Sequence, residues 1–188
     1  AANGVNFNHV RPEVLEGLVE YGFYALTISI DGCSPETYEM YRKKGKLEAV
    51  LENIRALNAV KKKSASALPH LIWQFIVFGH NEHEIVPAAF QAYQLGMQIR
   101  YKLQWDDEFS PVMDRERVTR IIGAATRAVY RRAHGESYMS PICRQLWVLP
   151  VIDADGTVLG CCKNWWGTFG ANVFRDGLSE AVNAEPMQ

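Results

Sequence analysis

The sequence predicts an α/β fold with about three parallel strands and helices packed outside them. Helical and strand patterns alternate over the first hundred or so residues, and the stretches between them are short. Short connections that contain a helix join strands that run parallel. Helices on the outside of such a sheet then cover its apolar face.

Three segments, 25–30, 71–78 and 99–105, are predicted as the strands. Each is short, is rich in β-branched or aromatic residues and is bounded by polar or turn-forming residues. An isolated three-stranded parallel sheet has two unpaired edges, so we expect missing neighbours or self-association through these edges.

Four helices are expected around these strands. The first, 12–21, has apolar residues on one face and a glycine after it. Ser34 and Pro35 open the second as N-cap and first-turn proline. The third covers 47–60, and Asn81 with Glu84 predicts a capping box for the fourth.

The chain divides into three parts by composition. Residues 1–108 form the α/β part, and 109–140 form a linker with a basic helix over 114–133. Residues 141–188 form a small module, in which segments 147–152 and 157–161 predict a hairpin around the turn pair Asp155-Gly156.

Charge and hydropathy exclude several classes of partner. The chain has 20 Lys and Arg against 21 Asp and Glu, a formal net charge of −1. A neutral total argues against nucleic acid or an anionic membrane held by bulk charge. The apolar runs are too short to span a bilayer. We therefore expect a cytoplasmic protein with no nucleic-acid and no membrane partner.

Polar residues alternate with apolar ones along the predicted strands and would share one face of the sheet. The polar set consists of Thr27, Ser29, Asp31, Gln74, Arg100, Lys102 and Gln104. Ligands of α/β proteins bind at the carboxyl ends of strands, which favours Asp31, Phe78 and Gln104. The alternative is internal ion pairing, for instance between Asp31 and Lys102.

Arg42 is a candidate ligand for a carboxylate, because its planar fork suits that group better than a lysine does. Taken alone, residues 41–44 also fit a basic helix end, which the helix dipole favours.

Three of the four cysteines, Cys143, Cys161 and Cys162, flank the predicted hairpin. Thiolates on a hairpin can converge on a zinc ion or an iron–sulfur cluster. Adjacent strand residues face opposite sides, so Cys161 and Cys162 cannot easily share one metal. A cluster normally takes four thiolates, so further ligands are expected from outside this chain. Buried free thiols are the alternative.

Several segments in order resemble the radical S-adenosylmethionine (radical SAM) superfamily, in the branch with a C-terminal auxiliary-cluster domain called SPASM or Twitch. The similar segments are residues 3–4, 26–32, 34–38, 41–42, 71–78 and 81–85. Cys143, twelve residues, Gly156, four residues and Cys161 resemble the start of the auxiliary-cluster motif.

The resemblance implies a partial (β/α)₆ barrel followed by a small SPASM/Twitch-like module. It implies an oxidoreductase that cleaves S-adenosylmethionine reductively at a 4Fe–4S cluster and abstracts a hydrogen from a peptide or small molecule. It also implies an auxiliary iron–sulfur cluster.

Site roles follow from the same resemblance, residue by residue. Ser29 and Asp31 would lie beside the ribose or amino acid part of the cofactor, and Arg42 would pair with its carboxylate. Ile76 and Phe78 would form a wall for adenine. The residues expected on the substrate side are Gln74 and Lys102, and the metal ligands are Cys143, Cys161 and, less directly, Cys162.

The chain departs widely from the family: the first three strands of the family's barrel are missing, and its later cysteines would fall after Gln188. No CxxxCxxC loop is present, and Cys33 is the only cysteine before residue 143. We therefore expect an internal piece of a longer enzyme, inactive by itself, and assign no catalytic residue. The alternatives are a non-enzymatic metal-binding module and a protein-interaction domain on an α/β scaffold.

Overall fold

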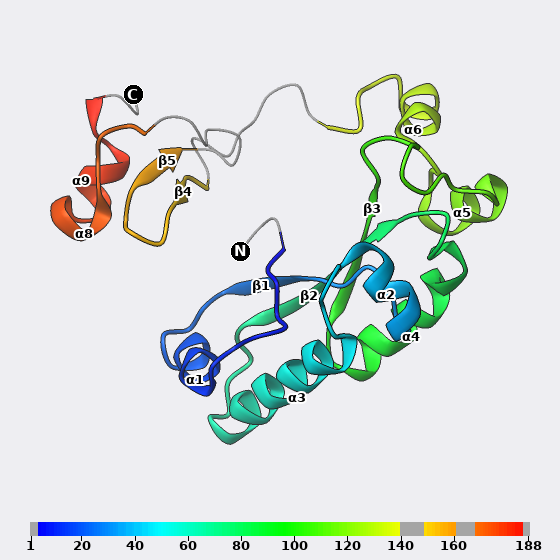
Figure 1. The fold of residues 1–188 in the computed structure, drawn as a ribbon. Helices are drawn as coiled ribbons and strands as arrows, with labels where there is room; N and C mark the ends of the chain where they lie inside the picture. The colour runs from blue at the N-terminus through cyan, green and yellow to red at the C-terminus, as the bar shows by residue number, and fades with distance from the viewer. Residues whose placement is uncertain (1–3, 140–148, 161–167, 186–188) are drawn as a thin grey trace. The chain divides into compact units, whose positions relative to one another are not determined.

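The computed structural model describes residues 4–139, 149–160 and 168–185. The chain forms two compact units, Ala1–Glu136 and Ser137–Gln188. Among the described residues, the first holds the sheet and most of the helices, and the second holds a hairpin and two short helices (Figure 1).

The sheet of the first unit has three parallel strands in chain order. They are β1 (Ala25–Ser29), β2 (His70–Val77) and β3 (Gln98–Leu103), with β2 in the centre. At the outer edge of β1, Val5 forms a parallel bridge with Ile28, and its N–H donates to the Thr27 carbonyl at 2.8 Å. The predicted α/β class with three parallel strands is confirmed.

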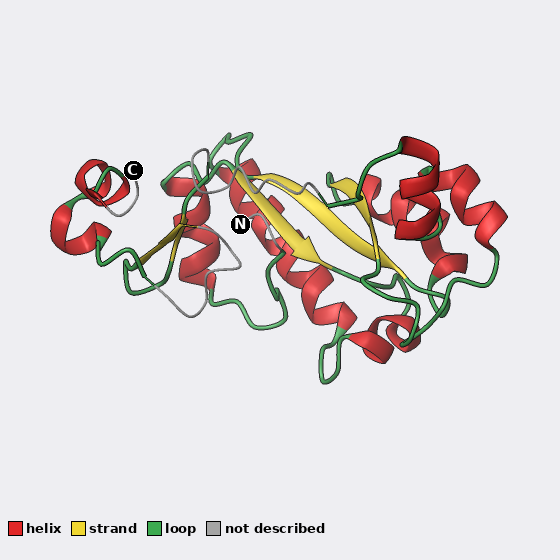
Figure 2. Ribbon diagram, turned by 90° about the horizontal axis from the view of Figure 1, so that it is seen from above, coloured by secondary structure: helices red, strands yellow, loops and turns green. Residues whose placement is uncertain are grey.

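The helices connect these strands, as Figure 2 shows. They are α1 (Pro12–Glu20), α2 (Pro35–Tyr41), α3 (Leu47–Lys63), the short 3₁₀ helix η1 (Glu82–Glu84) and α4 (Ile85–Gln94). Ser34 caps α2 as predicted, since its side chain accepts the Thr37 N–H.

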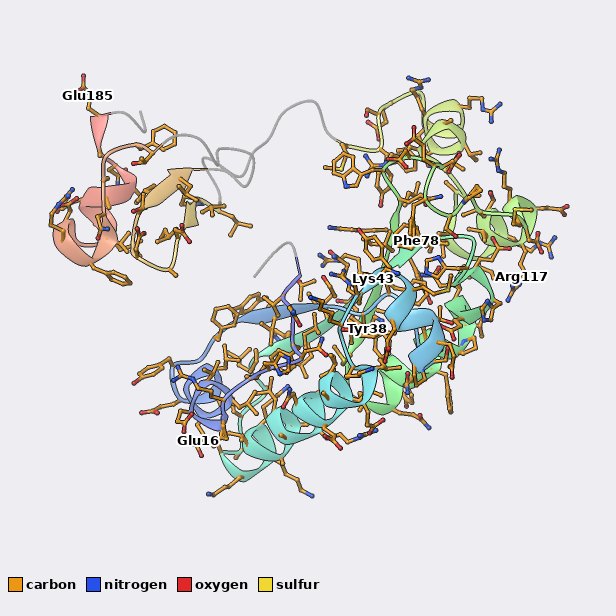
Figure 3. All side chains as sticks on the ribbon, in the orientation of Figure 1. Glu16, Tyr38, Lys43, Phe78, Arg117 and Glu185 are labelled. Carbon is orange, nitrogen blue, oxygen red and sulfur yellow. The ribbon has the colours of Figure 1, made fainter. Side chains whose placement is uncertain are left out.

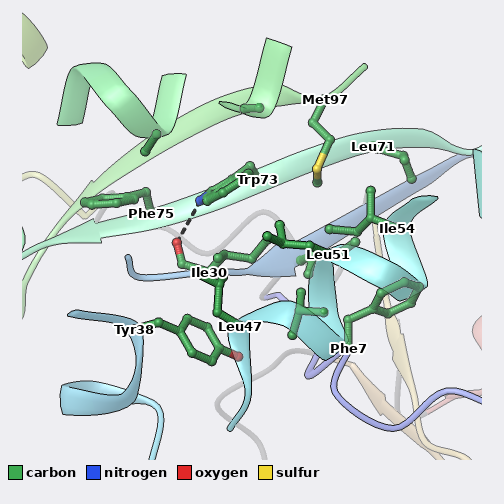
Figure 4. Close-up of a cluster of buried hydrophobic side chains, with 14 of the residues drawn as sticks. Phe7, Ile30, Tyr38, Leu47, Leu51, Ile54, Leu71, Trp73, Phe75 and Met97 are labelled. Atoms are coloured by element: carbon green, nitrogen blue, oxygen red, sulfur yellow. Dashed lines mark hydrogen bonds between the residues drawn. The ribbon is translucent and has the colours of Figure 1, made fainter. Parts of the chain in front are cut away.

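One face of the sheet carries the hydrophobic core. Ile28 and Ile30 of the β1 segment and Trp73 and Phe75 of β2 are fully buried, and they share a cluster with apolar residues of α1 to α4. Figure 4 shows this packing around Trp73. Because side chains alternate along a strand, the remaining strand positions face away from the helices.

The basic segment after β3 forms two helices, whereas the sequence predicts one over 114–133. They are α5 (Arg115–Ile122) and α6 (Arg127–His134). Gly123 ends α5 with φ +89°, and the Thr126 side chain accepts the Val129 N–H to begin α6. Val118 is part of the core of the first unit, so α5 packs onto that unit.

The second unit contains the predicted hairpin in a shorter form. β4 (Val151–Ile152) pairs antiparallel with β5 (Val158–Gly160), and α8 (Val173–Asp176) and α9 (Leu178–Val182) follow. The turn is closed by hydrogen bonds between Asp153 and Thr157 and between Gly156 and Asp153. Its small core is formed by Val158, Ala171 and Ala181.

Within the described ranges, none of the helices combines the length and the apolar character that crossing a membrane would require. The longest of them, α3, has 17 residues and ends in three lysines.

Candidate functional site

The polar side chains of the three strands lie on the face opposite the helices. Ser29 is in register with Gln74, and Ile76 is in register with Lys102. The Gln74 amide nitrogen Nε2 donates to Ser29 Oγ at 3.2 Å. Thr27, Ser29 and Gln74 are at most 5 % exposed, so this part of the polar face is covered.

The N-terminal segment approaches Ser29 very closely. Gly4 has φ +86°, and a Cβ on it would collide with the Ser29 hydroxyl. Both features require glycine at this position. The segment thereby covers Ser29 and carries Asn6, Asn8 and His9 to the end of β1.

β1 and β2 separate where β1 ends. The N–H of Ile30 still donates to the Gln74 carbonyl at 2.9 Å, so a regular parallel ladder would pair the Ile30 carbonyl with the Ile76 N–H. Instead the Trp73 indole donates to the Ile30 carbonyl, and Asp31 Oδ1 accepts the Ile76 N–H at 2.7 Å. The Asp31 carboxylate therefore bridges the gap between the two strands.

Arg42 holds the other oxygen of that carboxylate. Its Nε lies 2.7 Å and its Nη2 lies 2.5 Å from Asp31 Oδ2. The Asp31 side chain is completely buried, and that of Arg42 is 30 % exposed. Burial raises the pKa of the Asp31 carboxyl above its ordinary value, while the Arg42 guanidinium opposes this rise. The internal ion pair of Asp31 is thus formed with Arg42, while the charge of Lys102 also lowers the pKa of Asp31.

The Asn81 side chain forms hydrogen bonds to the backbone at the same two strand ends. Its amide nitrogen donates to the carbonyls of Asp31 and Ile76, and its Oδ1 accepts the Phe78 N–H at 2.8 Å. The predicted capping box is therefore wrong, because Asn81 is occupied by the strand ends. Glu84, its expected partner, instead accepts the Cys33 N–H at 2.7 Å.

A cavity of about 380 Å³ opens beside Ser29 and Arg42. The N-terminal segment contributes Asn6, Asn8 and His9, and α2 with the turn after it contributes most of the remainder. These further residues are Tyr38, Tyr41, Lys43, Lys44 and Gly45. The described residues that line the cavity include Arg42, Lys43 and Lys44 but no carboxylate, so this part of its wall is positively charged.

An aromatic cluster of Tyr41, Phe78, His80 and Phe109 adjoins this cavity through Tyr41. The ring centres of Tyr41 and Phe78 are 4.6 Å apart, and His80 stacks on Phe78 at 5.2 Å. Phe109 contacts the other three rings from the loop after β3. Ser110 fixes that loop, since its carbonyl accepts the Gly79 N–H.

The structure brings only part of the sequence-predicted set to the cavity. Ser29 and Arg42 line it, Asp31 and Gln74 contact these two, and Phe78 reaches it only through Tyr41. Ile76 and Lys102 lie on the same sheet face without lining it. Cys143, Cys161 and Cys162 lie outside the described residues.

Sequence reasoning missed Lys43, Lys44 and Tyr41 as cavity residues. In the sequence they form the pattern of a basic helix end. Only the folded turn after α2 shows that they line the cavity. The described part of the chain contains no group of three or more His, Cys, Asp or Glu residues that could hold a metal ion.

We compared the chain with known protein families, curated proteins and solved structures. No protein-family model, no curated protein and no solved structure matches the chain.

Proposed function

We propose that this chain is part of a radical SAM oxidoreductase, and that the cavity beside Ser29 and Arg42 receives the amino acid end of S-adenosylmethionine. The observation that carries the proposal is the Asp31–Arg42 pair at the carboxyl ends of parallel strands, next to a cavity. Ligands of open parallel sheets bind at such strand ends.

The residues present fit a carboxylate. Asp31 engages Nε and Nη2 of Arg42, so the guanidinium is held in place while Nη1 is not part of this ion pair. A fixed guanidinium that lines a cavity can bind a carboxylate with little loss of side-chain entropy. Asp31 then serves as a positioning residue for Arg42, because both of its oxygens are already engaged.

The fold is compatible with the proposed barrel. Four parallel neighbours follow each other in chain order, from Val5 through β1 and β2 to β3. Sequential parallel order with helices on one face is the arrangement of barrel-type α/β proteins. We propose that the sheet is one arc of a partial (β/α)₆ barrel, and that the second unit is a SPASM/Twitch-like module.

The difficult chemistry would belong to the cofactor and not to this chain. Bound at a reduced 4Fe–4S cluster, S-adenosylmethionine supplies the chemistry of hydrogen abstraction. The chain would bind and orient the amino acid end through Arg42 and Ser29. The substrate, a peptide or a small molecule, would lie towards Lys102 and the sheet face that carries Gln74, although Gln74 itself is covered in this structure.

Calorimetric titration of the 188-residue chain with S-adenosylmethionine tests the cofactor assignment. We expect saturable binding that Arg42→Lys weakens about tenfold, because lysine keeps the charge and loses the fork. Arg55→Lys is the matched control, since Arg55 forms an exposed pair with Glu48. The assignment is wrong if no binding saturates or if both variants behave alike.

Iron binding after anaerobic reconstitution tests the auxiliary cluster separately. We expect visible absorbance and bound iron in the wild type and in Cys33→Ala, and loss of both in Cys143→Ala and Cys161→Ala. Iron that survives in the last two variants would contradict the proposed ligands. Zinc in place of iron would favour a non-enzymatic metal-binding module.

A further inference from the structure

The cavity beside Ser29 carries more positive charge than one carboxylate requires. Arg42, Lys43 and Lys44 follow one another along its wall, and His9 lies on the opposite segment. S-adenosylmethionine has one carboxylate, together with a positively charged sulfonium and ammonium. Arg42 by itself is sufficient to bind that carboxylate. The proposed cofactor therefore does not explain the presence of the two lysines in the cavity wall.

Among the residues that the structure describes, none pairs with either lysine to neutralise its charge. In the part of the chain that the structure describes, the nearby ion pair is formed by Lys46 with Glu39, and Lys43 and Lys44 form none. The buried carboxylate of Asp31, which contacts Arg42 on this wall, is engaged by Arg42 and by the Ile76 N–H. The positive charge of the two lysines is therefore available to a ligand.

The turn that carries the lysines is held in one conformation. Lys44 has φ +63°, and the turn is closed by the Gly45 N–H, which donates to the Arg42 carbonyl at 2.9 Å. A Cβ on Gly45 would lie only 2.9 Å from the buried Tyr38 ring, so Gly45 packs directly against it. Tyr38 is itself fixed, since its hydroxyl accepts a hydrogen bond from Asn8 at 2.9 Å. Figure 3 shows Tyr38 and Lys43 at this end of α2.

A basic helix end explains part of this pattern but not all of it. Cations are favoured after the carboxyl end of a helix, where the helix dipole is negative. That effect does not require a cavity of about 380 Å³ in front of the cations, or a lining without carboxylates among its described residues. A volume of this order is typical of small-molecule sites.

We infer that this cavity binds a phosphate-bearing small molecule, with the phosphate against Lys43, Lys44 and Arg42. Phosphate carries more than one negative charge and several acceptor oxygens, which suits a guanidinium and two ammonium groups. Asn6 and Ser29 lie where hydrogen bonds to the rest of such a ligand can form. The inference does not depend on the proposed function, because that proposal makes no use of the lysines.

Titration of the 188-residue chain with inorganic pyrophosphate tests the inference. We expect saturable binding that weakens about tenfold or more in the double variant Lys43→Gln, Lys44→Gln. Both lysines are exposed, so the variant should fold, and its melting temperature checks this. The matched control is Lys62→Gln, Lys63→Gln, which removes the same charge from the exposed end of α3.

The outcomes separate this inference from the proposed function. Equal weakening in the two double variants, or titration without saturation, would mean a diffuse charge effect and would overturn the inference. Pyrophosphate binding that depends on Lys43 and Lys44 supports it, even if S-adenosylmethionine does not bind. If both ligands bind, they share Arg42, and pyrophosphate should then compete with S-adenosylmethionine for the cavity.

Discussion

The Trp73 indole N–H donates to the Ile30 carbonyl at 2.7 Å, in place of the backbone group that a regular ladder would offer. The bond joins β2 to the residue that follows β1, and Trp73 has no exposed surface (Figure 4). It frees the Ile76 N–H, which then bonds to Asp31. A core side chain thus sets the place where the two strands part and the candidate site begins.

Trp73→Phe should lower the free energy of unfolding by about 2–3 kcal/mol, because it leaves the buried Ile30 carbonyl without its donor and adds a small cavity. Urea denaturation measures this loss. Trp105→Phe is the control, since Trp105 is 68 % exposed, and we expect it to change stability by about 0.5 kcal/mol or less. Similar losses in both variants would count against the described role of Trp73.

Asp31→Asn should destabilise the first unit by about 2 kcal/mol. The amide can still accept the Ile76 N–H, but the half-buried Arg42 loses its counter-charge. Glu48→Gln breaks the exposed pair with Arg55 and should cost only about 0.5 kcal/mol. Denaturation of both variants at one ionic strength makes the comparison, and equal costs would mean that the Asp31–Arg42 pair is not structural.

The strands and their faces could be predicted from the sequence. Alternation places Ser29 and Asp31 opposite Ile28 and Ile30, and the structure keeps that division. This works because a strand has a period of two residues, which survives whatever the neighbouring strands do. The parallel direction of the three strands likewise follows from the connections that contain a helix.

The pairings within the site could not be predicted in the same way. Trp73 is only an apolar residue in the pattern, and nothing local reveals that its N–H meets a carbonyl 43 residues away. Asn81 has the spacing of a helix cap, yet two strand ends compete successfully for its side chain. Such choices depend on tertiary distances, which local patterns do not contain.

Cys33 should resist alkylation in the folded chain. Burial and the adjacent Glu84 carboxylate raise the pKa of the Cys33 thiol to about 12. At pH 8 the thiolate fraction is then roughly 10⁻⁴, against roughly 10⁻¹ for an ordinary thiol. Mass spectrometry of the Cys33 peptide after brief iodoacetamide treatment should show little modification until urea is added. Glu84→Gln should speed the reaction, and rapid labelling of the native wild type would disprove this environment.

His80 should make the folded state less stable as the solution becomes acidic. Burial lowers the pKa of the His80 imidazole below its ordinary value, with Glu84 opposing and His83 adding to the shift. The unfolded chain then binds a proton below about pH 6.5 that the folded chain binds more weakly. Stability therefore falls as the pH drops through this window.

Urea denaturation at pH 7 and pH 5 measures this effect. The loss of stability between the two should be smaller in His80→Phe than in the wild type, because phenylalanine keeps the ring stack on Phe78 and cannot bind a proton. The same change at the exposed His70 gives the comparison. An unchanged pH dependence in His80→Phe would show that other groups cause it.

Lys44→Gly separates backbone strain from charge in the cavity wall. Lys44 has φ +63°, a conformation that costs a non-glycine residue about 1 kcal/mol, so glycine should raise the free energy of unfolding by up to about 1 kcal/mol. The same variant removes one ammonium and should weaken pyrophosphate binding severalfold. Ala65→Gly is the matched control, because Ala65 has φ +50° and lies outside the cavity. Ala65→Gly should gain similar stability and leave the pyrophosphate affinity unchanged. If Lys44→Gly also leaves that affinity unchanged, Lys44 does not belong to the proposed phosphate site.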